Sequence, residues 1–428
     1  MNIIQIIPGS GGSFYCGNCL RDSKYFNALR AEGHKVTKIP MYLPLFADEH
    51  DISDVPIFYG AISLYLKQVY PIFRKAPGWL DKLLNSKPMM KIAASMAGST
   101  RAKGLEDMTV SMLLGEKGQQ KDELDHMVNW IAEHCQPDII HISNALLLGL
   151  ARRLKEKIGV PVLCTLQDED VWIDPMQPKF QKKIWDLMHE RAKDVDVLVS
   201  VSDFFAGVMK ERMNLKNGKI KTIHLGVDVE DYKYISTQGK ERNVGYISRM
   251  CHKDGFDIVV DAFIELKKKS GFEDVKLLAT GGLTGDDAKF LKEQKRKLKN
   301  RNLLESFEIL PHFEGKEVND FFKRVSLVSV PVRIGEAFGM YMIESMASGV
   351  PVVQPALGAF PEIIELSGGG VTYMPNTPQK LSETWADLLS NPDKLEELSK
   401  KGYEGTISKF NIHNHAKEII TLYESLRK

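Results

Sequence analysis

The stretch VPVRIGEAFGMYMIESMASGVPVVQPALGAFPEII, residues 330–364, is the most informative part of the chain. An apolar run at residues 326–331 predicts a buried strand, and a glycine-bearing turn follows at residues 335–339. Residues 340–348 then place apolar side chains at helical spacing, which predicts a helix. Gly349 ends this helix, and the proline two residues later prevents its continuation. The stretch therefore predicts a strand–turn–helix unit that leads into a further strand.

Two carboxylates belong to this unit, Glu336 on the turn and Glu344 inside the helix. The first peptide N–H groups of the helix, at Phe338, Gly339 and Met340, have no partner within the helix and lie at the positive end of its dipole. We expect them to bind a phosphate. Glu344 can accept hydrogen bonds from vicinal hydroxyls such as those of a ribose. A single glutamate is often only a solvated surface residue, but the combined pattern favours a site.

Length and composition describe an ordinary globular protein. A chain of 428 residues exceeds the roughly 250–300 residues that one core usually covers, which predicts two domains. Hydrophobic residues make up 43% of the chain and charged residues 26%, and no apolar run reaches the length of a membrane span. The net charge of +1 gives no basis for binding a polyanion, so we predict no nucleic-acid partner.

The cellular compartment is predicted from the cysteines and the first residues. Five cysteines in so long a chain form no disulfide framework, which suits a reducing cytosol. The start MNIIQII is too short and uncharged for a secretory signal and reads instead as a buried strand. We therefore predict a cytoplasmic protein, with the inner membrane surface as an alternative that depends on the insertion described below.

Strand and helix candidates alternate through both halves of the chain, which predicts parallel sheets flanked by helices. The expected fold is α/β, with two doubly wound, Rossmann-like domains facing a cleft. We place the N-terminal domain at residues 1–228, completed by a C-terminal helix at 411–428, and the second domain at 229–410. Within the first domain we expect a helix over residues 145–157 and a loop at QDEDVWIDP, residues 167–175.

A long insertion, residues 44–120, interrupts the first domain. Its middle part, residues 64–103, carries eight lysines and arginines against one aspartate, with four aromatic residues interleaved. Such a basic, aromatic segment favours contact with an anionic membrane surface or with an acidic acceptor. The alternative is a solvated helical cap whose aromatic side chains pack inward.

Two cations follow the first strand of the second domain, in the sequence GYISRMCHKDGFD. Arg249 can clamp a diphosphate with its fork of N–H donors, and Lys253 can do so as a point charge. Taken alone, such residues are usually solvated surface charges. Beside the turn that carries Glu336, they favour an anion site.

The N-terminal glycine loop, PGSGGSFYC, lacks the Gly-x-Gly-x-x-Gly spacing of a dinucleotide site. Close approach of its backbone to an anion remains a prediction, through Gly12 or Gly17. Cys16 and Cys19 form a Cys-x-x-Cys pair at the start of the next helix, where thiol pKa values fall. The pair is interpreted as structural, with redox chemistry as the alternative, since no further cysteine pair or histidine cluster completes a zinc set.

An acidic cluster follows the strand that ends in Thr-Leu-Gln. The carboxylates of Asp168, Glu169, Asp170 and Asp174 are candidates for orienting sugar hydroxyls or for moving a proton. Coordination of magnesium or calcium is a competing use of the same oxygen atoms. A solvated acidic loop is the third interpretation.

With these segments in order, the chain resembles the retaining glycosyltransferases of family 4, which have the two-domain GT-B architecture. The resemblance rests on AEGHKV, PDIIHIS, SVSDFF, HLGVD and GYISRMCHKDGFD, and above all on EAFGMYMIESMASGVPVVQPALGAFPEII. It covers nearly the whole chain apart from the insertion. It implies a nucleotide-sugar donor bound mainly by the second domain, and no essential metal or other cofactor.

The resemblance also implies individual roles. Arg249 and Lys253 would contact the diphosphate, and the amides of Phe338, Gly339 and Met340 would contact the phosphate and sugar. Glu344 would hold the ribose and Glu336 would lie beside the donor sugar as a catalytic residue. The residues that fall where the base is contacted are His312 and Phe313, and Gly17 falls on the second glycine of the family's Gly-Gly turn.

The chain departs from the family pattern after the strand that contains Thr165. Where many members have histidine in a Thr-x-His pattern, this chain has Gln167, which can act neither as acid nor as base. Asp168 or Asp170 is the candidate to take that catalytic role, with a sugar-holding role for the glutamine as the alternative. His224 likewise replaces the usual asparagine before Gly-Val-Asp.

The sequence therefore predicts a glycosyltransferase, a hexosyltransferase, that moves a sugar to a hydroxyl acceptor with retention at the anomeric carbon. A glycan or a lipid-linked acceptor is expected. The alternatives are a nucleotide-sugar epimerase of related architecture and a non-catalytic protein that binds nucleotide sugars.

Overall fold

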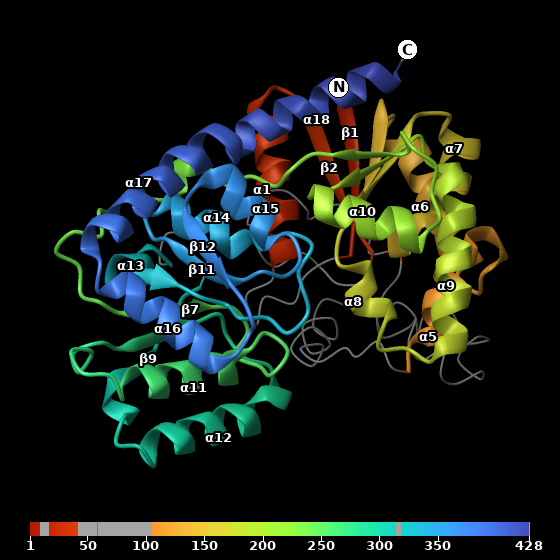
Figure 1. Ribbon diagram of the computed structural model, residues 1–428. Helices are drawn as coiled ribbons and strands as arrows, with labels where there is room; N and C mark the ends of the chain where they lie inside the picture. Colours follow the sequence, from red (N-terminus) through yellow and green to blue (C-terminus); the bar gives the residue numbers. More distant parts are fainter. Residues whose placement is uncertain (9–16, 42–57, 59–103, 314–317, 428) are drawn as a thin grey trace. The chain divides into compact units, whose positions relative to one another are not determined.

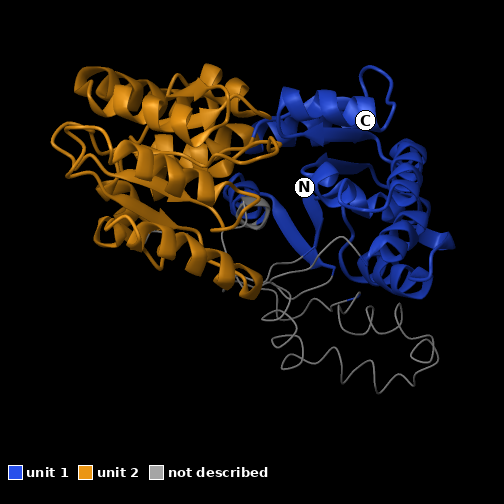
Figure 2. Ribbon diagram, turned by 60° about the horizontal axis from the view of Figure 1, so that its bottom comes forward, with its two compact units in different colours: residues 1–12, 18–224, 416–428 blue, residues 13–17, 225–415 orange. Residues whose placement is uncertain are grey.

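The computed structural model describes residues 1–8, 17–41, 58, 104–313 and 318–427. The chain forms two compact units (Figure 2). Unit 1 comprises residues 1–12, 18–224 and 416–428, and unit 2 comprises residues 13–17 and 225–415. The divisions at 224/225 and 415/416 lie a few residues from those expected at 228/229 and 410/411. A parallel bridge inside unit 2, in which Val227 pairs with Asn411, lies a few residues from each of these two divisions.

Unit 1 is built on a six-stranded parallel sheet with the order β2-β1-β3-β4-β5-β6. From β1 the chain adds β2 on one side and then crosses to add β3 to β6 on the other, so the strand order reverses between β1 and β3. The strands are β1 (Asn2–Ile7), β2 (Lys35–Pro40), β3 (Ile139–Ile142), β4 (Val162–Leu166), β5 (Val197–Ser200) and β6 (Ile220–Thr222).

The described helices of unit 1 connect and cover these strands (Figure 1). They are α1 (Gly17–Ala31), α5 (Glu106–Leu114), η3 (Gly115–Lys117), α6 (Lys121–His134), η4 (Ala145–Leu150), α7 (Ala151–Ile158), α8 (Glu169–Ile173), α9 (Pro178–Arg191), η5 (Ala192–Asp194), α10 (Asp203–Arg212) and, from Ala416 onward, α18 (Ile412–Leu426).

Unit 2 is likewise built on a six-stranded parallel sheet, with the strand order β12-β11-β10-β7-β8-β9. The chain builds outward from β7 to β9 on one side and then from β10 to β12 on the other, so the order reverses between β7 and β10. The strands are β7 (Val244–Ile247), β8 (Leu277–Thr280), β9 (Phe307–Ile309), β10 (Leu327–Val328), β11 (Val352–Pro355) and β12 (Gly370–Tyr373).

The helices of unit 2 within the described ranges lie between and around these strands. They are η6 (Val229–Asp231), α11 (Phe256–Leu266), η7 (Gly285–Asp287), α12 (Ala288–Lys299), η8 (Leu304–Ser306), α13 (Val318–Arg324), α14 (Met340–Ala347), α15 (Phe360–Ser367), α16 (Pro378–Leu389) and α17 (Pro392–Lys409).

Continuous burial of the central strands explains why they read as apolar runs rather than as alternating patterns. All five residues of β4 and all four of β7 are buried. Parallel strands covered by helices on both faces have no solvent side, so successive side chains both enter the core. The predicted α/β fold with two doubly wound sheets is confirmed.

Two local predictions in unit 1 were wrong. Residues 145–150 form a 3-10 helix, and the α-helix begins only at Ala151. A Cβ on Gly149 would lie 2.0 Å from the carbonyl oxygen of Met112, so the segment is pressed against α5. The acidic segment expected as a loop contains α8, whose first turn holds Glu169 and Asp170 at its positive end.

Within the described ranges, no helix combines the length and apolar character that crossing a membrane requires. Most of the predicted insertion, including residues 64–103, lies outside those ranges. Of its described residues, Phe58 is buried and its ring lies 5.7 Å from the ring of Trp130 on α6.

Candidate functional site

The candidate site of unit 2 lies at the carboxyl ends of β7 and β10, where the strand order reverses. In open α/β sheets the loops diverge at such a point and leave room for a ligand. Arg249 and Lys253 follow β7, and the turn at Glu336–Gly339 follows β10. The topology thus places the predicted phosphate-binding groups at one edge of one sheet.

Glycines allow the loops at this edge to pack closely. Gly255, with φ +74°, lies so near the loop after β10 that a Cβ would be 2.0 Å from the carbonyl oxygen of Pro331. A Cβ on Gly335 would lie 2.3 Å from the backbone nitrogen of Gly358, in the loop after β11. Any larger residue at these positions would push the loops apart, so the glycines fix the backbone on which the site is built.

The turn before α14 offers a ligand backbone peptide groups rather than side chains. Gly339, with φ +95°, is the N-cap of the helix in a left-handed conformation. The side chains of Phe338 and Met340 are buried, and the ring of Phe338 packs edge-on against Phe410 at 5.9 Å. The two residues can therefore act on a ligand through their peptide groups. The amides at the start of α14 suit an anion.

Glu336 is half-buried on this turn. Its carbonyl oxygen accepts a hydrogen bond from the Ala359 amide at 3.1 Å, which joins the turn to the loop after β11. Burial, and then the nearby Glu336 carboxylate, raise the pKa of the Tyr341 hydroxyl well above its usual value. Tyr341 therefore remains a neutral phenol beside a carboxylate.

Glu344 is only 4% exposed, although it is charged. The hydroxyl of Tyr232 donates a hydrogen bond of 2.8 Å to its Oε1 atom. A buried carboxylate requires such donors because its desolvation is costly. Sequence reasoning identified Glu344 but missed Tyr232, which lies 112 residues earlier in the segment that enters unit 2.

Arg249 is held by a partner that the sequence analysis also missed. Its Nε donates to Oδ2 of Asp287 at 2.7 Å, and its Nη2 donates to Oδ1 at 3.0 Å and to the Thr284 hydroxyl at 2.7 Å. Burial alone would lower the pKa of Arg249, but the hydrogen bonds and charge of Asp287 raise it. The Thr-x-x-Asp spacing of a capping box, residues 284–287, is the sequence signal that marks Asp287.

Lys253 lies exposed on the loop after β7. Its carbonyl oxygen accepts a hydrogen bond from the Arg333 amide at 3.2 Å, a second tie between the loops after β7 and β10. Burial raises the pKa of the neighbouring Asp254, although the charge of Lys253 opposes that change. The ammonium group can thus reach a ligand while its backbone is fixed.

The residues predicted near the base lie at the carboxyl end of the sheet, after β9. His312 is exposed and Phe313 is half-buried. The Thr280 hydroxyl, at the end of β8, donates to the carbonyl oxygen of His312 at 2.8 Å. Within the described residues no group of three or more histidines, cysteines or carboxylates is arranged to hold a metal ion.

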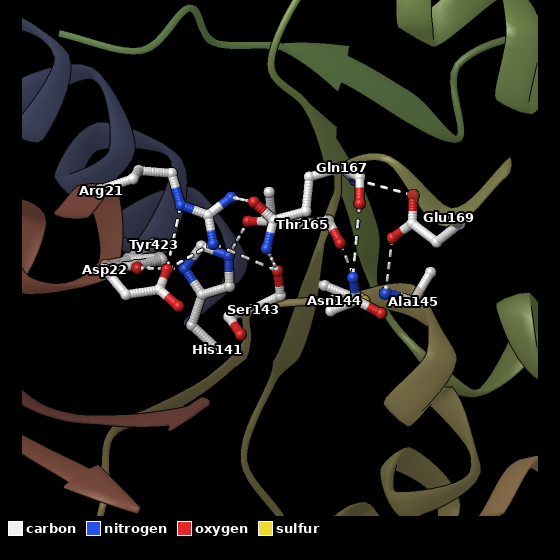
Figure 3. A network of polar contacts seen from close by, with 11 residues as sticks. Arg21, Asp22, His141, Ser143, Asn144, Ala145, Thr165, Gln167, Glu169 and Tyr423 are labelled. Carbon is white, nitrogen blue, oxygen red and sulfur yellow. Dashed lines mark hydrogen bonds and ion pairs between the residues drawn. The ribbon is translucent and has the colours of Figure 1, made fainter. Parts of the chain in front are cut away.

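Unit 1 contains a buried polar network at the carboxyl ends of β3 and β4 (Figure 3). The Gln167 side chain is bound at both ends, since its Oε1 accepts from Nη1 of Arg21 and its Nε2 donates to the Ser143 carbonyl oxygen at 2.8 Å. Arg21 is 5% exposed and its Nε also donates to Asp22 at 2.9 Å. Gln167 is therefore fixed within the protein by complementary donors and acceptors.

Glu169 joins two loops of unit 1. The amide of Ala145 donates to its Oε1 at 2.8 Å, and the amide of Gln167 donates to its Oε2 at 2.7 Å (Figure 3). The side chain is fully buried. Burial raises the pKa of Glu169 to about 8, although the backbone N–H groups oppose that change. The alternative of a solvated acidic loop is therefore wrong for this residue.

Asp168, the candidate for the catalytic role, is half-buried at the N-cap of α8. Its backbone is left-handed, with φ +53°, which is uncommon for a residue other than glycine and is seen most often for Asn and Asp. Burial, and then the charge of Asp168, raise the pKa of Asp170. The structure thus separates the roles of these neighbours, since Glu169 points into the core and Asp168 does not.

His141 lies deeper in the same network. Its Nδ1 is 2.6 Å from the Tyr423 hydroxyl on α18, and its Nε2 is 2.7 Å from the Thr165 hydroxyl. Burial, and then the charge of Arg21, lower the pKa of His141 to about 3. This histidine therefore stays neutral and ties the end of the chain to the sheet.

Some predicted residues lie outside the described ranges, namely Gly12 and Cys16. Gly17 is the first residue of α1, and Cys19 belongs to the same helix. The proposed anion contact of the glycine loop and the role of the cysteine pair remain predictions.

Comparison with known proteins gives the same assignment for both halves of the chain. Residues 230–405 match the sequence model of glycosyl transferases group 1, and residues 119–231 match that of glycosyltransferase family 4. An uncharacterized glycosyltransferase, MJ1178 of Methanocaldococcus jannaschii, is 27% identical over 296 residues, which cover 68% of this chain and 76% of the relative. The lipopolysaccharide core mannosyltransferase LpsB of Rhizobium meliloti is 29% identical over 203 residues, or 46% and 56% of the two chains.

Solved structures share the fold over the whole chain. Sucrose-phosphate synthase of Thermosynechococcus elongatus has a TM-score of 0.72 at 16% identity, covering 99% of this chain and 98% of that one. HepE of Anabaena, solved in complex with UDP and glucose, has a TM-score of 0.68 at 17% identity and full coverage of both chains. With two matching family models and this fold, the chain belongs to the group 1 glycosyltransferases and has the GT-B type of architecture.

Proposed function

We propose that this glycosyltransferase takes a hexose or a similar sugar from a nucleotide-diphosphate donor and transfers it to a hydroxyl acceptor with retention at the anomeric carbon. The observation that carries the donor assignment is the carboxyl end of the unit 2 sheet, where the loops after β7 and β10 diverge. The connections after β7 and β8 supply the Arg249–Asp287 pair, and α14, which follows β10, supplies its amino-terminal amides and the buried carboxylate of Glu344. That set suits the phosphates and the ribose of one ligand.

The chemistry requires the bond between the anomeric carbon and the diphosphate oxygen to break. Negative charge then grows on the leaving diphosphate, and we assign its stabilisation to Arg249, Lys253 and the amides around Gly339. Preorganised charges of this kind usually supply the largest share of catalysis. Asp287 contributes by holding the guanidinium through two hydrogen bonds, so the group needs little rearrangement when the charge develops.

Glu336 is assigned to the donor sugar, because it lies on the turn three residues before the helix N-cap. HepE, which shares the fold, was solved with UDP and with UDP-glucose, and this supports a nucleotide sugar as the donor. Arg249 and Lys253 supply the positive charge that a metal ion would otherwise provide, so the reaction is proposed to need no metal.

Acceptor binding is assigned to unit 1. Gln167 has no titratable proton and both ends of its amide are bound within the protein, so we assign it a structural role. Asp168 is the candidate to accept the acceptor's proton or to orient its hydroxyl. Relatives named for lipopolysaccharide core and colanic acid biosynthesis support a glycan or a lipid-linked acceptor.

The main claim is tested by incubating the protein with UDP-, GDP- and ADP-sugars and measuring nucleotide release, with and without EDTA. We expect release with one donor family, unchanged by the chelator. Arg249→Ala and Glu344→Ala separate an enzyme from a sensor, since an enzyme loses turnover whereas a sensor loses only binding. Failure to bind any nucleotide sugar would overturn the proposal.

The proposed membrane contact through residues 64–103 needs its own experiment. Flotation with anionic liposomes is compared for the full chain and for a chain that lacks these residues. We expect the deletion to reduce flotation. Equal flotation of the two chains would contradict a membrane role for the segment.

A further inference from the structure

We propose that Tyr232 is a positioning residue for the nucleotide, acting through Glu344. The inference rests on the proposed function, in which Glu344 holds the vicinal hydroxyls of the ribose. It adds a residue from the segment that enters unit 2, 112 residues before Glu344 in the sequence. It also explains how a buried carboxylate keeps one orientation before a donor binds.

The contact itself is short and buried. The Tyr232 hydroxyl donates to Oε1 of Glu344 at 2.8 Å, and the two side chains are 9% and 4% exposed. Hydrogen bonds to ionised acceptors are roughly twice as strong as neutral ones. A carboxylate bound in this way at one oxygen loses the freedom to rotate, so the group that meets the diol is already oriented.

The chain around Tyr232 is fixed on both sides, which makes this contact specific. On one side the Nδ2 of Asn319 donates to the carbonyl oxygen of Asp231 at 2.9 Å. On the other, the amide of Ile235 donates to the Ser348 carbonyl oxygen, at the end of α14, at 3.2 Å. The phenol ring also packs edge-on against Phe322, with 6.3 Å between the ring centroids. The phenol is thus held for the carboxylate by the backbone and by packing.

The protonation states agree with a donor–acceptor pair. Burial, and then the charge of Glu344, raise the pKa of Tyr232 well above its usual value. The phenol therefore keeps its proton throughout the physiological pH range and always donates. Without this hydroxyl, Glu344 would be a buried carboxylate with one donor fewer, and its orientation would be less restricted. That change weakens its acceptance of two ribose hydroxyls.

A control with the same chemistry lies two residues further along the chain. The Tyr234 hydroxyl donates to Oε1 of Glu396 at 3.2 Å, so Tyr234→Phe also removes a tyrosine–glutamate hydrogen bond from this segment. Glu396 keeps further donors in Ser236 and Thr237, and it lies on α17 rather than on α14. Tyr234→Phe therefore reports any general effect of loosening the segment.

The experiment measures binding of UDP, GDP and ADP, and of the 2′-deoxy form of whichever binds, by calorimetry to wild type, Tyr232→Phe, Tyr234→Phe and Glu344→Gln. We expect Tyr232→Phe to weaken the ribonucleotide about tenfold and the deoxynucleotide much less. Tyr234→Phe should leave both unchanged. Because phenylalanine keeps the ring against Phe322, we expect the variant to fold, and its thermal midpoint verifies this.

The outcomes separate the two proposals. If Glu344→Gln binds the ribonucleotide as tightly as wild type, or if no nucleotide binds at all, the proposed role of the site fails. If Glu344→Gln weakens binding but Tyr232→Phe does not, only the inference about Tyr232 is overturned. Equal weakening of ribo- and deoxynucleotide by Tyr232→Phe would also overturn it, because the hydroxyl would then act on the fold and not on the ribose.

Discussion

Arg249 and Asp287 form a two-point ion pair, with Nε–Oδ2 and Nη2–Oδ1 distances of 2.7 and 3.0 Å. Asp287 is the last residue of η7, which follows β8, so the pair joins the connections after β7 and β8 at the carboxyl end of the unit 2 sheet. We predict that Arg249→Ala lowers kcat/KM by about 100-fold or more, because a preorganised charge at the leaving group is lost. Asp287→Asn should lower kcat/KM less, on the order of tenfold, since the cation remains but is no longer held by a carboxylate.

Steady-state kinetics with the best donor measure both effects. A matched control is Arg242→Ala, which removes another arginine–aspartate pair of unit 2, in which Nε of Arg242 lies 3.1 Å from Asp274. Exposed pairs contribute about 0–1 kcal/mol, so this variant should keep wild-type activity. A comparable loss of activity in Arg242→Ala would argue against a special role for Arg249.

Gly255→Ala is predicted to disturb the site through its backbone. The new Cβ would lie 2.0 Å from the carbonyl oxygen of Pro331, so the loops after β7 and β10 must separate. We expect a loss of about 3 kcal/mol in the free energy of unfolding, together with weaker nucleotide binding.

Gly239→Ala separates strain from steric clash. Gly239 has a similar φ of +79°, but a Cβ there would meet nothing within 4 Å. Gly239→Ala should lower the free energy of unfolding by only about 1 kcal/mol, the usual penalty for a residue other than glycine in a left-handed backbone conformation. Equal losses in the two variants, measured by urea unfolding, would show that close contact of the loops is unimportant.

Glu169 should make unfolding depend on pH, because burial raises its pKa from 4.5 to about 8 in the folded chain. Below about pH 4.5 the carboxyl is protonated in both the folded and the unfolded states. Between that pH and about 8 the unfolded chain has released the proton while the folded chain retains it. The free energy of unfolding therefore falls as pH rises through this window, by up to about 1.4 kcal/mol per pH unit.

Urea unfolding of wild type and Glu169→Gln across pH 5–8.5 measures this contribution as the difference between two curves. In the glutamine variant, the free energy of unfolding should no longer show this decrease as the pH rises. Glu133→Gln, at an exposed position of α6, serves as the control and should follow wild type. Parallel curves for wild type and Glu169→Gln would contradict the raised pKa.

His141 should produce the opposite dependence at lower pH. Burial, and then Arg21, lower its pKa from 6.5 to about 3, so it stays neutral in the fold while the unfolded chain takes up a proton. Its contribution to stability is present above about pH 6.5 and is lost as pH falls toward 3. His141→Gln should reduce this sensitivity between pH 6.5 and 4, as read from thermal midpoints. His189→Gln, at a half-buried position of α9, should retain it.

Much of the fold follows from local patterns in the sequence. The end of the helix α14 was predicted within one residue, because Gly349 ends the helix and Pro351 prevents its continuation. The start of α7 was missed, since a 3-10 helix at residues 145–150 depends on the close contact between Gly149 and Met112, which belong to different elements.

The site shows the same division between local and distant causes. Arg249 and Glu344 could be selected from their neighbours in sequence, but their partners Asp287 and Tyr232 are 38 and 112 residues away. The inward orientation of Glu169, in a run of four consecutive polar residues, depends on the amide of Ala145, 24 residues earlier. No pattern within one segment contains such information, because it arises from how the strands are ordered.

The hydrogen bond between His141 and Tyr423 has a consequence for the order of events during synthesis. Unit 1 contains the first strand of the chain and also residues 416–428, so its sheet emerges from the ribosome long before the helix that completes it. Domains made early usually fold while synthesis continues. Here unit 1 can be completed only after unit 2 has been translated, because residues 416–428 follow unit 2 in the chain. Until then His141 lacks its hydrogen bond to the Tyr423 hydroxyl.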